Sequence, residues 1–162
     1  MLALLFCVPL SAEGQVVKKV LTTQKSKTLR DGSLYKGDMM LMRPHGRGKR
    51  TYTDGAVYQG QFEYGKRHGQ GVMTYTNGDK YEGEWYKGLR HGKGIYHFAD
   101  GRRYEGSFME DVIQGFGTIY YVNGDTYTGL WEQGERHGTG VYIWCDDGSN
   151  YNGEWCHDHK HG

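Results

Sequence analysis

One residue pattern recurs through most of the chain and constrains its fold more than any other feature. A tyrosine followed two positions later by a glycine recurs six times in one register, four intervals being 23 residues and the last 24. The tyrosines are Tyr35, Tyr58, Tyr81, Tyr104, Tyr127 and Tyr151. Self-similarity at a fixed period of this length is typical of an array in which every copy repeats one small unit of structure.

The glycines keep the same register as the tyrosines. With each tyrosine as position one, positions three and twelve are glycine in all six copies, and an Asp-Gly or Asn-Gly pair closes each complete copy. Such pairs are favoured in tight hairpin turns, where both central residues are expected to take positive φ. The pattern therefore predicts one β-hairpin in each copy. The closing pairs join the copies into a continuous antiparallel meander, with a half copy before Tyr35 and an incomplete sixth copy.

Large rings occupy positions one, five and eighteen. Positions one and five share a face because side chains alternate along a strand, and a second short strand is expected over about positions fourteen to eighteen. A ring laid across a neighbouring glycine restores the contact that the glycine lacks. The sequence predicts an all-β, elongated, single-layer sheet with an aromatic groove that serves both packing and partner contact. Its rings are Tyr58, Phe62, Tyr75, Tyr81, Trp85, Phe98, Tyr104, Phe108, Tyr121, Tyr127, Trp131, Trp144, Tyr151 and Trp155.

The repeat array is expected over residues 26–162, after an extension of different composition at residues 1–25. The extension is apolar over Met1 to Leu10 and then basic, and it is expected to be disordered or strap-like. A secretory signal would carry Lys or Arg before its apolar run, and neither residue precedes the run here. A signal, a docking strap and a mis-assigned start all stay open for this segment.

The pattern YxGxW…G…HGxG…NG at this period resembles the MORN repeat, the membrane occupation and recognition nexus, over about Asp31 to Gly162. Residues 64–71 and 124–129, and the one-residue expansion before Tyr151, are similar to the radial-spoke-head MORN proteins of motile cilia. That resemblance implies a non-catalytic scaffold for radial-spoke-head or cytoskeletal proteins, in the cytoplasm on the axoneme of a cilium or flagellum. The alternatives are a phosphoinositide or acidic-membrane tether and a regulatory module of a larger complex.

Charge and cysteine usage exclude several other classes. Lys and Arg total 20 against 19 Asp and Glu, so the net charge of +1 gives no basis for nucleic-acid binding. The three cysteines form no CxxC pair, which argues against a disulfide framework and a four-ligand zinc site. No run of 18 apolar residues is present to form a membrane-spanning helix.

The sequence predicts no catalytic residue, cofactor or metal. A histidine recurs at position eleven in five copies, which favours a structural turn residue, since a catalytic histidine occurs once with fixed partners. Gly60 to Lys66 fits GxxxxGK, but Arg67 stands where Ser or Thr should bind magnesium and no helix is expected to follow. Four possible metal ligands near the end of the chain have loose spacing and are interpreted as unliganded: Cys156, His157, His159 and His161.

Two kinds of hairpin tip are candidate surfaces. Position ten is cationic in four copies, and a solvated edge is favoured there over contact with acidic lipid: Arg67, Arg90, Arg136 and Lys160. Two tips are apolar instead, and they are candidate partner contacts or local packing sites: Met40, Leu41 and Met42 in the first copy, and Val112 and Ile113 in the fourth. The strand that ends at Trp155 is expected to leave an open edge where a second copy of the chain could pair.

Overall fold

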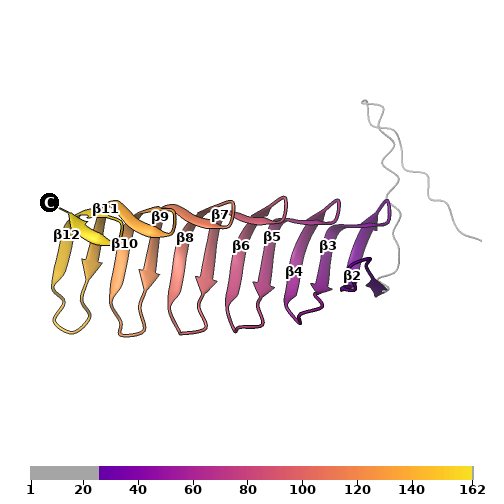
Figure 1. Ribbon diagram of the computed structural model, residues 1–162, viewed down its shortest axis with the longest axis horizontal. Helices are drawn as coiled ribbons and strands as arrows, with labels where there is room; N and C mark the ends of the chain where they lie inside the picture. The colour runs from indigo at the N-terminus through magenta and orange to yellow at the C-terminus, as the bar shows by residue number, and fades with distance from the viewer. Residues whose placement is uncertain (1–25, 162) are drawn as a thin grey trace, which may run out of the picture.

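The computed structural model describes residues 26–161, which form one open antiparallel sheet whose thirteen strands pair in sequential order (Figure 1). This confirms the predicted all-β meander, while the predicted extension at residues 1–25 lies outside the described residues. The strands are β1 (Lys27–Thr28), β2 (Leu34–Met40), β3 (Arg43–Thr51), β4 (Val57–Glu63), β5 (Lys66–Thr74), β6 (Lys80–Tyr86), β7 (Leu89–His97), β8 (Arg103–Met109), β9 (Val112–Tyr120), β10 (Thr126–Glu132), β11 (Glu135–Ile143), β12 (Asn150–Cys156) and β13 (His159–His161).

Two kinds of turn alternate along the sheet. Within the second copy, Tyr64 and Gly65 join β4 to β5, and both have positive φ (47° and 90°), as a two-residue type I′ turn requires. Between copies, the Tyr75 N–H donates to the Asp79 carbonyl at 2.9 Å and the Gly78 N–H donates to the Tyr75 carbonyl at 3.2 Å. Only Gly78 has positive φ there, at 95°. The expectation that both closing residues take positive φ is therefore wrong; a type I turn with a glycine bulge joins the copies.

The second strand of each copy is longer than predicted. In the second copy, β5 runs from position nine to position seventeen, so the position-eleven His68 lies within a strand and not in a turn. The pairing of β4 with β5 shifts after Gly60 and Gly71, and Gly69 has positive φ (57°) inside this irregular stretch. A bulge bends the strand while the hairpin continues.

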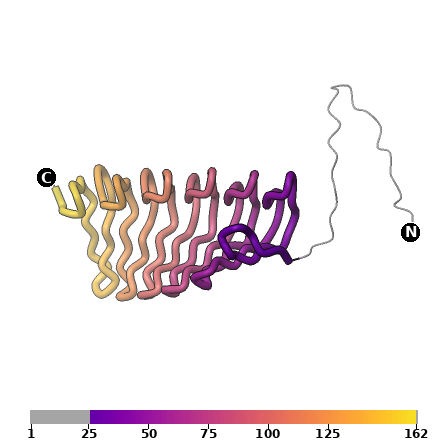
Figure 2. Tube along the Cα trace, turned by 45° about the vertical axis from the view of Figure 1, so that its right-hand side comes forward, coloured from indigo at the N-terminus to yellow at the C-terminus, as the bar shows by residue number. Residues whose placement is uncertain are grey.

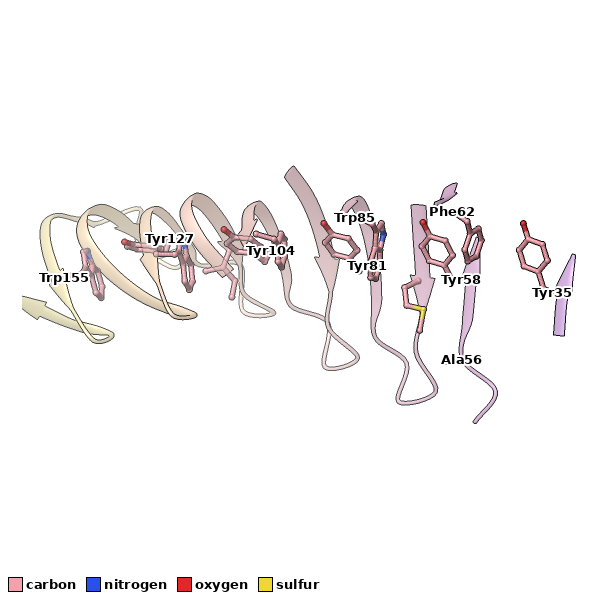
Figure 3. Packing of buried hydrophobic residues seen from close by; sticks show 13 residues of the cluster. Tyr35, Ala56, Tyr58, Phe62, Tyr81, Trp85, Tyr104, Tyr127 and Trp155 are labelled. Atoms are coloured by element: carbon pink, nitrogen blue, oxygen red, sulfur yellow. The ribbon is translucent and has the colours of Figure 1, made fainter. Parts of the chain in front are cut away.

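The core is a single row of rings on one face of the sheet. The position-one tyrosines of the first five copies are at most 1% exposed. Each position-five ring packs edge-to-face between two of them: the centroid of Trp85 lies 5.3 Å from that of Tyr58 and 5.1 Å from that of Tyr81. Figure 3 shows the row following the long axis of the molecule. One thin sheet obtains a core this way because each ring packs on rings from neighbouring copies.

Paired glycines let the tyrosine rings lie against the backbone. Gly71 pairs with Gly60 on one side and with Gly83 on the other, and equivalent pairs follow along the sheet. A Cβ on Gly71 would lie 2.2 Å from the Tyr58 hydroxyl oxygen. The row of glycines therefore extends from copy to copy, and the described residues form an elongated ribbon with β1 and β13 at opposite ends (Figure 2).

Candidate functional site

The face opposite the rings carries two adjoining hollows. Side chains at positions two, four, thirteen and fifteen point to this face because side chains alternate along a strand. One hollow, of about 930 Å³, crosses β2 to β5, and the other, of about 830 Å³, crosses β5 to β9. They share Gln70 and Val72 and are floored by the paired glycines. We call the two hollows together the glycine-floored groove.

Charge is segregated along this groove. The hollow over β2 to β5 is lined by Lys36, Arg47 and Lys49, and we call these three residues the basic zone. One carboxylate lies beside it, because Asp38 accepts from the Arg47 backbone N–H at 3.1 Å. The hollow over β5 to β9 is lined by three glutamates, the acidic zone, together with Lys93: Glu82, Glu84 and Glu105. The two signs therefore follow one another along the long axis of the molecule.

The acidic zone keeps exposed carboxylates that an incoming cation can reach. Glu82 pairs with Lys80 at 2.5 Å and Glu105 pairs with Arg103 at 2.9 Å, and the two glutamate side chains are 40% and 53% exposed. Ion pairs this exposed contribute less than about 1 kcal/mol, so a partner's cation can replace them.

Apolar side chains extend the same face beyond the acidic zone. Phe116 and Tyr120, on β9, line the hollow and are 55% and 37% exposed. Leu130 and Ile143, on β10 and β11, are 43% and 45% exposed at positions four and seventeen. Exposed rings beside polar groups are typical of protein contact surfaces.

The predicted aromatic groove is on the other face, and most of it is core. Nine of its rings are buried: Tyr58, Phe62, Tyr81, Trp85, Tyr104, Phe108, Tyr127, Trp131 and Trp155. The remaining five are half-buried: Tyr75, Phe98, Tyr121, Trp144 and Tyr151. Trp144 and Trp155 line a smaller hollow of about 380 Å³ beside Lys160. Most of these rings therefore pack on one another along the sheet, and their contact with a partner stays a prediction.

The two apolar tips differ in exposure. Leu41 and Met42 are 82% and 76% exposed, and Met40 is half-buried. Val112 and Ile113 are half-buried, and Ile113 packs against the core rings. The first tip is therefore free to contact a partner, whereas the fourth tip is engaged in local packing.

The three position-ten arginines link neighbouring tips, so the expectation of a solvated edge is wrong for them, whereas Lys160 is exposed. The Arg67 guanidinium lies 4.2 Å from the Trp85 ring centroid and donates to the Gly88 carbonyl at 2.6 Å. The side chains of Arg90 and Arg136 are only 19% and 18% exposed. Because these cations bond to the next copy, they are poorly placed to meet lipid headgroups. Sequence reasoning missed this contact, although each arginine is followed one copy later by a position-five ring.

Several side chains have pKa values that burial or hydrogen bonds within the fold shift from their ordinary values. Burial raises the pKa of Tyr35 and of Tyr127 to about 12. Hydrogen bonds from the Tyr142 hydroxyl group and the Cys145 N–H lower the pKa of Asp125 in a turn. Residues 60–66, the GxxxxGK match, lie across the second hairpin and not between a strand and a helix. Each of these groups thus has a structural explanation.

A family model matches the same register. The model of the MORN repeat matches residues 35–57, 58–80, 81–102, 104–126 and 127–149. This chain belongs to the MORN-repeat family. MORN repeats generally mediate protein or membrane interactions, so an interaction module is the function that the family supports. Residues 26–161 form no helix long and apolar enough to cross a membrane.

Other comparisons of this MORN-repeat protein are more distant. No curated protein sequence matches it. Among solved structures, it is similar to the SAS-4 (dCPAP) TCP domain of Drosophila melanogaster, solved with a proline-rich motif of Ana2 (dSTIL). The sequence identity is 11% and the TM-score is 0.36, and the match covers 93% of this chain and 97% of that one. It also matches a streptogramin B lyase at 14% identity and a TM-score of 0.18 over 80% and 39% of the two chains.

Proposed function

We propose that this MORN-repeat protein is a non-catalytic scaffold that holds an extended segment of a partner protein in the glycine-floored groove. The observation that carries the proposal is the segregation of charge along that groove. An acidic membrane presents one sign of charge throughout, whereas a polypeptide can place carboxylates over Lys36, Arg47 and Lys49 and cations over the acidic zone. Complementary charge fixes the register and direction of a bound segment.

The spacing of the zones sets the spacing expected in the partner. The basic zone centres on β3 and the acidic zone on β7, four strands farther along the sheet. Four strand steps of about 4.8 Å give roughly 19 Å, which an extended chain covers in about six residues. The partner segment should carry acidic residues, then basic residues about six positions away, then apolar ones over Phe116 and Tyr120.

Synthetic peptides with this spacing test the proposal. We expect fluorescence anisotropy to show salt-sensitive binding of the bipolar peptide in one of its two charge orders. Arg47→Glu combined with Lys49→Glu should weaken binding at least tenfold, about 1.4 kcal/mol. Lys87→Glu, at an exposed tip outside the groove, is the matched control and should have no effect. Equal binding of uniformly charged peptides, or an ineffective charge reversal, would contradict the proposal.

We also propose that the scaffold belongs to the radial spoke head of a motile cilium or flagellum. The support is the similarity of residues 64–71 and 124–129 to radial-spoke-head MORN proteins. A tagged chain expressed in ciliated cells should fractionate with axonemes and co-purify with spoke-head proteins. Recovery in the membrane-and-matrix fraction alone would contradict this assignment.

Light scattering of the purified chain tests the further proposal that its C-terminal edge pairs with a second copy.

A membrane tether is the second candidate, and the basic zone favours it. Lys36, Arg47 and Lys49 line one hollow together, and each cation near an anionic surface contributes about 1 kcal/mol. Sedimentation with acidic vesicles separates the candidates. Salt-sensitive binding that Lys49→Glu abolishes would support the tether, and indifference to the vesicles would support the protein scaffold.

A further inference from the structure

The last two copies bring together three side chains of the types that bind transition metals. One ligand atom from each of His137, Cys156 and His157 lies within 4.8 Å of the others. His137 is on β11, Cys156 ends β12, and His157 begins the turn to β13. The sequence interpretation excluded a metal site in this segment. The structure keeps two of the residues considered there and adds a histidine from the preceding copy.

The repeat itself explains this arrangement. In the first two copies the position-eleven histidine packs on a tyrosine of the next tip: the ring centroids of His45 and Tyr64 are 5.2 Å apart, and those of His68 and Tyr86 are 5.5 Å apart. The same register places His137 against the sixth tip, where Cys156 and His157 stand at the equivalent positions six and seven. The fold thus supplies the proximity, and the local sequence supplies the ligand types.

One carboxylate is hydrogen-bonded to His157 and a second lies near His137. Glu132 Oε2 lies 3.3 Å from His137 Nε2, and Glu135 Oε2 lies 2.7 Å from His157 Nδ1. A proton on each of these nitrogens would leave the other ring nitrogen with a free lone pair. His137 Nδ1 is buried without a hydrogen-bond partner, as are His68 Nδ1 and His91 Nδ1, so the repeat itself leaves this nitrogen available and the sixth tip adds the other ligand types. A carboxylate hydrogen-bonded to a histidine, as Glu135 is to His157, is the usual arrangement around a protein-bound metal.

We propose that His137, Cys156 and His157 bind one divalent cation of the zinc class. Two imidazoles and a thiolate are preferred by zinc, cobalt and copper over magnesium or calcium. Metal–ligand bonds of about 2.0–2.3 Å place tetrahedral ligands about 3.5 Å apart, so these side chains would close by about 1 Å. The His157 side chain is 70% exposed on a turn and has room to rotate. A bound ion would link the sixth copy to the fifth.

A cobalt titration of the full chain tests this site directly. We expect uptake of one equivalent of Co²⁺ with the near-ultraviolet charge-transfer absorption of a thiolate ligand, and displacement of the cobalt by Zn²⁺. Cys156→Ser should abolish that absorption, whereas Cys145→Ser, which removes an exposed free thiol elsewhere, should leave it unchanged.

Matched histidine variants complete the test. His137→Ala should weaken binding at least tenfold, and His91→Ala, at the same position in an earlier copy, should not. His157→Ala should likewise weaken it, and His159→Ala, on neighbouring β13, should not. Uptake below one equivalent at micromolar metal would overturn the proposal. So would control variants that bind the metal as weakly as the site variants do.

A stability measurement distinguishes the loss of metal binding from a variant that merely disturbs the structure of the tip. Zn²⁺ should raise the melting temperature of the natural chain, because a ligand that binds only the folded state stabilises it. It should not raise that of Cys156→Ser, which nearly preserves side-chain size. An equal rise in both proteins would show that the metal binds elsewhere and would also overturn the proposal.

Discussion

At the scale of the residue, each position-one tyrosine acts as a unit with the glycines beside it. The Tyr58 hydroxyl group donates to the Gln61 carbonyl at 2.9 Å, and Tyr81 donates to the Glu84 carbonyl at the same distance. These bonds satisfy a carbonyl next to the bulge, where ladder pairing is irregular. The hydroxyl can reach that carbonyl because the ring lies against a backbone that has no Cβ.

Gly71→Ala tests this unit. The new Cβ would lie 2.2 Å from the Tyr58 hydroxyl oxygen and 2.5 Å from the adjoining ring carbon, so the ring must move. We expect the free energy of unfolding to fall by about 1–3 kcal/mol, measured by urea denaturation. Gln59→Ala is the control, because Gln59 is an exposed strand residue on the opposite face from the rings. Equal losses in the two variants would contradict the steric explanation.

At the scale of the element, neighbouring hairpins are joined at their tips as well as along their strands. The Asp111 carboxylate accepts from the Arg90 backbone N–H at 2.9 Å and from its Nε at 3.0 Å. The same guanidinium donates to the Asp111 carbonyl at 2.6 Å, and Arg136 repeats the whole set with Asp158. Charge-assisted bonds of this kind are stronger than neutral ones, so the tips resist separation.

Arg90→Ala should lower the free energy of unfolding by about 1–3 kcal/mol, because it removes the guanidinium donors and leaves the Asp111 carboxylate with only the backbone N–H. Arg90→Lys should recover only part of the loss, since an ammonium group lacks the planar fork of the guanidinium. Arg47→Ala, at an exposed strand position, should change stability by less than about 0.5 kcal/mol. Similar urea midpoints for Arg90→Ala and Arg47→Ala would show that the tip contact contributes little.

At the scale of the whole molecule, stability is distributed along one row. Strands pair only with their sequence neighbours, so each copy is stabilised by the copies on either side. The row of buried tyrosines runs through the first five of them (Figure 3). A condition that acts on every tyrosine therefore acts on the entire ribbon at once.

High pH is such a condition. Burial raises the pKa of Tyr35 and Tyr127 to about 12, whereas an unfolded tyrosine titrates near 10. The folded state favours the neutral phenol, so its stability is complete below about pH 10 and falls as the pH rises towards 12. Urea midpoints measured across this range should fall steeply, together with the appearance of tyrosinate absorbance.

Variants separate buried from exposed rings in this measurement. Tyr127→Phe should reduce the slope of stability against pH, because one buried phenol no longer ionises. Tyr64→Phe removes a phenol that is 52% exposed and should leave the slope unchanged. Tyrosines that all titrate near pH 10 without loss of folded structure would contradict the prediction.

The sequence alone determined the period, the hairpin order and the ring face, because side-chain alternation and turn chemistry depend on residues that are close in the chain. The family followed from the same pattern. The position-ten contacts and the length of the second strand were missed, since a bulge at Gly69 shifts the register between Gly60 and His68. The glycine at position twelve has positive φ in each of the first five copies and so marks the bulge, but the sequence pattern does not say how far the strand pairing shifts there.

Only the tertiary structure decided which side chains meet across copies. Lys36 and Lys49 come from paired strands of the first copy, and the acidic zone comes from later strands, so the charged groove exists only once the strands lie side by side. His137 reaches Cys156 for the same reason, through the pairing of β11 with β12. Strand pairing converts a separation in sequence into a contact in space, and its register is a property of the assembled sheet.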